Sequence, residues 1–64
     1  MSQFKAKNLT ILQDQMIAES MACKKCDAYS VMSTDQCTKD LFCTLAQHHK
    51  DNFTKLFDYL NSHN

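Results

Sequence analysis

Glycine, proline and arginine are all absent from the 64 residues of this chain, and long apolar runs are absent as well. Without glycine the chain has neither GxxxxGK nor GxGxxG, the loops that cradle phosphate groups in nucleotide-binding proteins. The longest uninterrupted apolar run is three residues, too short for a membrane-spanning helix or the core of a signal peptide. We therefore expect no nucleotide site and no membrane contact. We expect a cytoplasmic chain, unless a larger assembly carries it elsewhere.

Charge and size narrow the protein class further. Seven lysines balance seven acidic residues, so the formal net charge is zero and no basic footprint for nucleic acid is present. Hydrophobic residues make up 44% of the chain. A domain of this size buries only about 60% of its unfolded surface, and it usually needs disulfides, a metal or oligomerisation to be stable.

Apolar residues recur at alternating steps of three and four, which is the spacing of one face of an α-helix. Period-two alternation, typical of strands, is not sustained anywhere. The pattern predicts an all-α chain with helices over residues 8–31 and 34–61, a flexible leader at 1–7 and a single domain at 8–64. The first inward row is Leu9, Leu12, Met16, Glu19, Cys23, Cys26 and Ser30. The second is Phe42, Leu45, His49, Phe53, Leu56 and Leu60.

The segment Ser33-Thr34-Asp35-Gln36 between the two rows has the pattern of a capping box. In that motif the Ser33 hydroxyl accepts from the Gln36 N–H, while the Gln36 side chain reaches back. Such a short connection allows only an antiparallel helical hairpin.

Further apolar residues widen the hydrophobic surface of both helices beyond one stripe. A hairpin that left this surface in water would expose a large apolar patch. Two hairpins packed face to face would cover it, so we expect a homodimer or higher oligomer in the form of a four-helix bundle. We expect the chains to associate through the stripe that holds Leu12, Met16, Leu45, Phe53 and Leu56. The residues outside the inward rows are Ile11, Ile17, Met21, Tyr29, Leu41, Phe57 and Tyr59.

The four cysteines lie at positions 23, 26, 37 and 43. Cys23 and Cys26 form a CxxC by eye, but they fall deep inside the first predicted helix, whereas zinc and redox CxxC motifs need a turn or a helix N-terminus. The pair is best interpreted as two small buried hydrophobic residues. The alternative is a soft-metal site that holds Cu(I) or Zn(II) by thiolates inside a bundle.

Glu19, the only glutamate, falls on the inward row, where a carboxylate is costly unless it is paired or bound to metal. A turn centred near Ser33-Thr34 places Glu19 level with His48, the first choice of partner, while His49 better continues the apolar row. One interpretation is a buried Glu–His hydrogen bond that fixes dimer register. The alternative is a metal site for one transition-metal ion, such as Zn, Fe or Cu, on Glu19, Cys23, His48 and His49.

A set of polar and apolar positions after residue 8 resembles the short spore coat proteins of endospore-forming bacteria, a group similar to the coat F family and to ferritin-like bundles. The resemblance implies a hairpin that assembles into a ferritin-like four-helix bundle, with a role in building the coat beside other coat proteins and no established activity. The residues that carry it are Asp14-Gln15, Glu19, Cys23, Lys25, Tyr29, Asp35, Lys39, Leu41-Phe42, Leu45-Ala46-Gln47-His48, Phe53, Leu56 and Tyr59-Leu60.

Ferritin-like di-iron sites need a Glu from each of two helices and Glu-x-x-His from each of the other two. Here Leu45 stands where the second glutamate of Leu45-Ala46-Gln47-His48 belongs, so the bridging carboxylates are missing. No nucleophile, base and orienting group fall together in the sequence either. We therefore expect a structural protein of the cytoplasm or spore coat, with no catalytic residues and no cofactor. Metal binding is the alternative.

Overall fold

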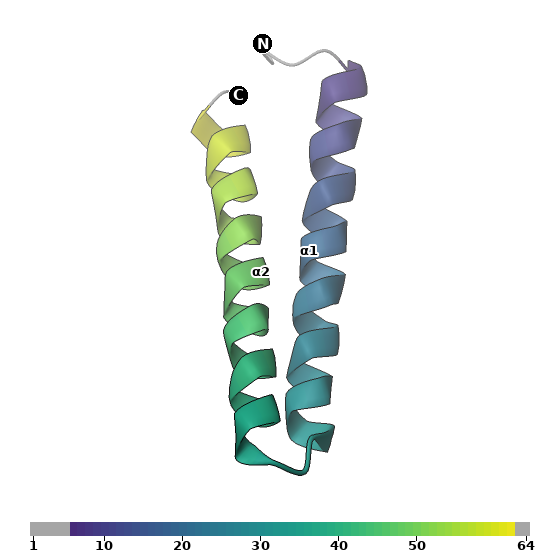
Figure 1. Ribbon diagram of the computed structural model, residues 1–64. Helices are drawn as coiled ribbons and strands as arrows, with labels where there is room; N and C mark the ends of the chain where they lie inside the picture. The colour runs from purple at the N-terminus through teal and green to yellow at the C-terminus, as the bar shows by residue number, and fades with distance from the viewer. Residues whose placement is uncertain (1–5, 63–64) are drawn as a thin grey trace.

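The chain forms an antiparallel hairpin of two helices in a computed structural model that describes residues 6–62 (Figure 1). Helix α1 spans Ala6–Met32 and helix α2 spans Gln36–Ser62. The predicted all-helical hairpin is confirmed, and within residues 6–62 no strand is present. Helix α1 begins two residues before its predicted start, so Ala6 and Lys7 are helical. Residues 1–5 of the predicted leader lie outside the described part.

Asp35 caps the N-terminus of α2. Its Oδ2 accepts hydrogen bonds from the backbone N–H of Thr38 and from the Thr38 hydroxyl, both at 2.9 Å. These bonds hold the pKa of the Asp35 carboxyl below its usual value, with the backbone bond as the larger cause. An oxygen acceptor three residues before a free helical N–H is the arrangement of an N-cap.

The predicted capping box of Ser33 and Gln36 is wrong. Ser33 lies directly after α1, and both its backbone N–H and its hydroxyl donate to the carbonyl of Tyr29, at 2.9 and 2.6 Å. The Gln36 side chain donates to Asp40 one turn later. Because Asp35 takes the cap position, α2 begins at Gln36 rather than at residue 34.

Lys39 ties the first turn of α2 to the last turns of α1. Its ammonium donates to the carbonyl oxygens of Ser30 and Val31 at 3.2 and 3.5 Å, and the Ser30 hydroxyl donates back to the Lys39 carbonyl at 3.3 Å. A cation at a helix C-terminus also suits the helix dipole. The rings of Tyr29 and Phe42 pack beside this junction, with centroids 5.4 Å apart.

The two predicted inward rows line the contact between α1 and α2, since every member is buried or half-buried. Among residues 6–62, only Glu19, Cys26 and Ala46 are buried, and no side chain is fully enclosed. The hairpin therefore has an apolar seam but no closed core. Over residues 6–62, neither helix has the length and hydropathy needed to cross a bilayer.

Candidate functional site

Glu19 and His49 meet at the middle of the hairpin. The Nδ1 atom of His49 lies 3.4 Å from both carboxylate oxygens of Glu19, at the long end of the hydrogen-bonding range. The tautomer that carries its proton on Nδ1 donates to the carboxylate. Glu19 is only 8% exposed, and no buried polar side-chain atom of the described residues lacks a partner. The predicted Glu–His contact across the hairpin is therefore present.

The partner is His49, and the preference for His48 was wrong. His48 is exposed, because neighbouring residues on a helix point about 100° apart and His49 takes the inward direction. The connection runs from Ser33 to Asp35 and is centred on Thr34. The sequence estimate placed the centre slightly earlier, between Ser33 and Thr34, and that small difference selects the neighbouring histidine.

Cys23, the fourth residue of the predicted metal set, is half-buried. It lines a hollow of about 250 Å³ together with Glu19, and the lysines Lys24 and Lys50 line the same hollow. Across residues 6–62 no three His, Cys, Asp or Glu side chains form a group that could hold a metal ion. The structure thus brings Glu19 together with His49 and leaves His48 in solvent. Metal binding stays a prediction.

All four cysteines carry free thiols. Cys26 is buried between the helices, which agrees with its interpretation as a small core residue, and Cys23 is half-buried. Cys37 and Cys43 are exposed, and the Cys43 sulfur lies 3.0 Å from the Ser30 hydroxyl oxygen. No described pair of cysteines is bridged.

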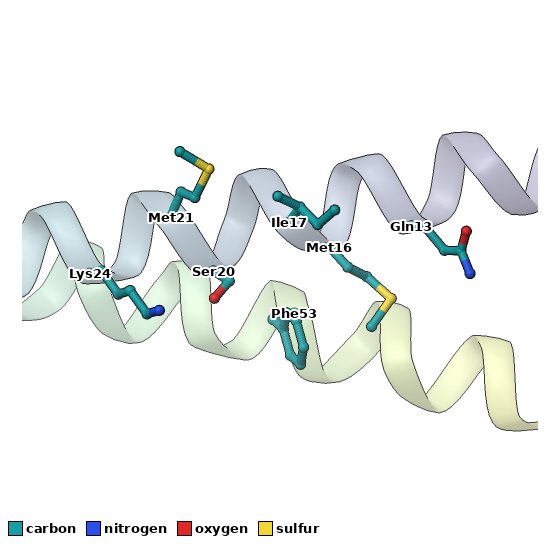
Figure 2. A pocket seen from close by; sticks show the side chains of 7 residues that line it. All are labelled: Gln13, Met16, Ile17, Ser20, Met21, Lys24 and Phe53. Carbon is teal, nitrogen blue, oxygen red and sulfur yellow. The ribbon is translucent and has the colours of Figure 1, made fainter.

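An open apolar groove of about 580 Å³ lies on the α1 side of the hairpin. Figure 2 shows Met16 and Phe53 where the two helices face each other, whereas Met21 points away from α2. The residues that line the groove are Gln13, Met16, Ile17, Ser20, Met21, Lys24 and Phe53.

Large apolar side chains also stand in solvent over much of the hairpin. Seven of them are the residues that the sequence placed outside the inward rows: Ile11, Ile17, Met21, Tyr29, Leu41, Phe57 and Tyr59. Val31 and Met32 are more exposed than any of these, at 80% and 73%, and sequence reasoning missed them. Their high exposure could have been predicted from their position in the last turn of α1, directly before the connection.

Comparisons with protein-family models, with curated proteins and with solved structures find no match to this chain.

Proposed function

We propose that this chain is a small structural protein without catalytic activity, and that it works as a homodimer or higher oligomer in which hairpins pair into a four-helix bundle. The observation that carries the proposal is that few hydrophobic residues are buried while many large ones are exposed. Among the described residues, Cys26 and Ala46 are the only buried hydrophobic ones, while nine large apolar side chains are exposed.

The exposed side chains supply the driving force for association. Moving one large aliphatic or aromatic side chain from water into an apolar environment contributes about 1.5–3 kcal/mol. A single hairpin leaves this free energy unused, and it pays the conformational entropy of ordering two helices of 27 residues. Most of these side chains are already about half-buried, so a partner that covers four of them adds about 3–6 kcal/mol before the cost of association, which is comparable with the stability of a marginal small domain.

The resemblance to short spore coat proteins supports a place for such a bundle in a larger shell. On this proposal the chain is a component of the spore coat, assembled from the cytoplasm, and its further partners are other coat proteins. A surface with apolar groups on several sides suits a subunit that meets more than one neighbour.

Sedimentation equilibrium over a wide concentration range tests the proposal. We expect dimers or larger species at micromolar concentration, and a melting temperature that rises with concentration because association stabilises the folded state. A monomer that melts cooperatively at the same temperature across the range would contradict it.

A second candidate function is metal binding by the bundle, and the contact between Glu19 and His49 favours it. Two copies related by a two-fold axis would supply two glutamates and two histidines to one transition-metal ion such as Zn, Fe or Cu. A melting temperature that rises when such an ion is added would distinguish this candidate from a purely structural pair.

A further inference from the structure

The two helices repeat one another at an interval of 30 residues. Both are 27 residues long, and α2 begins and ends 30 positions after α1. Glu19 and His49, which touch at the middle, are also separated by 30 positions. The residue types differ, so the repeat lies in placement and burial.

The repeat extends to a second row on each helix, beside the inward one. On α1 it is formed by Ile11, Ala18, Ala22 and Tyr29. On α2 it is formed by Leu41, His48, Asn52 and Tyr59, at the same steps of seven, four and seven. Steps of seven and four keep residues on one side of a helix. Ile11 and Leu41 are both 56% exposed, and Tyr29 and Tyr59 are 46% and 47% exposed.

Both second rows lie on the same face of the hairpin. Gln15, four positions after Ile11 on that side of α1, lines a hollow of about 280 Å³ together with Asn52 of α2. The opposite face holds different residues of both helices, among them Ser20 and Phe53. We call the face with the two second rows the paired-row face.

A local two-fold axis relates the two rows. In an antiparallel hairpin, a 180° rotation about an axis that passes between Glu19 and His49, at right angles to both helices, exchanges α1 with α2. Each residue of α1 then falls on the residue 30 positions later. The paired-row face therefore has an apolar pair at each end, Ile11 with Tyr59 and Tyr29 with Leu41.

We infer that a second copy of this chain docks on the paired-row face; this inference rests on the proposed function and names the surface that it uses. The face is complementary to itself. When two copies meet, the apolar ends of one lie over the apolar ends of the other, and this holds whether their connections are at the same end or at opposite ends. Two helices about 40 Å long and about 10 Å wide present about 800 Å², the area that each partner contributes to a standard interface.

The charges also favour this face over the opposite one. None of the eight residues of the two second rows is a lysine, aspartate or glutamate. On the opposite face Lys24, Asp27 and Lys50 surround the hollow beside Cys23. The hollow on the paired-row face is lined by one lysine, Lys55, beside Glu19. Burying the three charges of the opposite face against a partner would therefore cost more desolvation energy than burying Lys55.

Matched pairs of substitutions in the whole chain test the inference by sedimentation equilibrium. Ala18 and Ala28 are both exposed residues of α1, and only Ala18 belongs to the paired-row face. We expect Ala18→Glu to raise the dimer dissociation constant by about tenfold or more, because the carboxylate would be buried without a partner. Ala28→Glu should leave the constant within about twofold.

The second pair lies on α2, where Leu41 and Phe57 are exposed to similar extents on opposite faces. Leu41→Ser should weaken the dimer and Phe57→Ser should not. Far-UV circular dichroism of each variant, at matched fractions of dimer, shows whether the hairpin itself survives.

The outcomes separate this inference from the proposed function. A wild-type chain that stays monomeric at all concentrations overturns both. A dimer that Ala28→Glu or Phe57→Ser breaks, while Ala18→Glu and Leu41→Ser leave it intact, keeps the proposed function and overturns the paired-row face.

Discussion

Nδ1 of His49 lies at the same distance, 3.4 Å, from both carboxylate oxygens of Glu19, so one ring nitrogen is shared between two acceptors across the middle of the hairpin. Glu19 is among the three most buried described residues, and its contact with His49 is the polar contact at the middle of a mostly apolar seam. A buried polar pair of this kind fixes the relative position of two helices, because shifting either helix would leave a carboxylate unpaired in the interior.

If this pair is structural, replacing Glu19 with glutamine should be tolerated. An amide of the same shape still bonds to a neutral imidazole, so we expect the melting temperature of Glu19→Gln to stay within a few degrees of wild type. Glu19→Leu should be neutral or stabilising provided that water satisfies the His49 ring, whose side chain is 30% exposed, since apolar replacement of buried ionic groups is often tolerated when no partner is left unpaired. Thermal melts followed by circular dichroism measure both. Unfolding of Glu19→Gln at room temperature would show that the charge itself is required.

Thermal melts in the presence of metal distinguish the structural pair from a metal site. We expect the wild-type melting temperature to be the same in EDTA and with added Zn(II), Fe(II) or Cu(I), the ions being tested one at a time. Ligands that bind the folded state raise the melting temperature through linkage. A rise of several degrees that appears in wild type and disappears in Glu19→Gln would establish the metal site instead.

Asp35 should contribute to stability in a pH-dependent way. Its pKa is lower in the folded chain than the ordinary value of 3.8, chiefly because of the hydrogen bond from the Thr38 backbone. Its contribution is therefore complete above the unfolded pKa and is lost as the pH falls through the folded pKa. We expect Asp35→Ala to melt below wild type near neutral pH, and the difference to shrink towards about pH 2.

Asp35→Asn is the matched control for this titration. An asparagine cap keeps the acceptor oxygen but does not titrate, so its stabilisation should not change over the same pH range. A constant difference between wild type and Asp35→Ala from neutral pH to about pH 2 would contradict the assignment of Asp35 as an ionised cap.

The adjacent residues Ile11 and Leu12 should separate association from folding. Leu12 is half-buried against α2, whereas Ile11 is exposed on the paired-row face. In samples dilute enough to be monomeric, Leu12→Ala should lower the free energy of unfolding by about 1–3 kcal/mol, below the cost at a fully buried site. Ile11→Ala should change it by less than about 0.5 kcal/mol and should weaken only the dimer.

The inward rows are not the surface that joins two copies on this proposal; the paired-row face is. The sequence pattern suggested that association uses the inward rows, which the structure places between α1 and α2 within one chain. If Ile11→Ala and Leu12→Ala weaken the dimer equally without affecting the monomer, the two helices do not pack on each other along the inward rows.

Helical periodicity was enough to predict the fold from the sequence, because the apolar steps of three and four are regular on both helices. The same regularity placed Glu19 inside. It could not choose between His48 and His49, since these neighbours differ by a single step of register and the choice depends on where the connection is centred. The competition between Ser33 and Asp35 for the cap position sets that centre, and both residue types are good caps.

The 30-residue repeat has a consequence for how a partner is oriented. The two apolar ends of the paired-row face are alike, so they do not select the orientation of a docked copy. The connection of that copy could lie at either end. The choice then falls to the middle, where Ala18 and Ala22 lie beside the larger His48 and Asn52. Small residues pack best beneath large ones. If a second copy docks on the paired-row face, that rule places α1 of one copy over α2 of the other, which brings both connections to the same end of the proposed bundle.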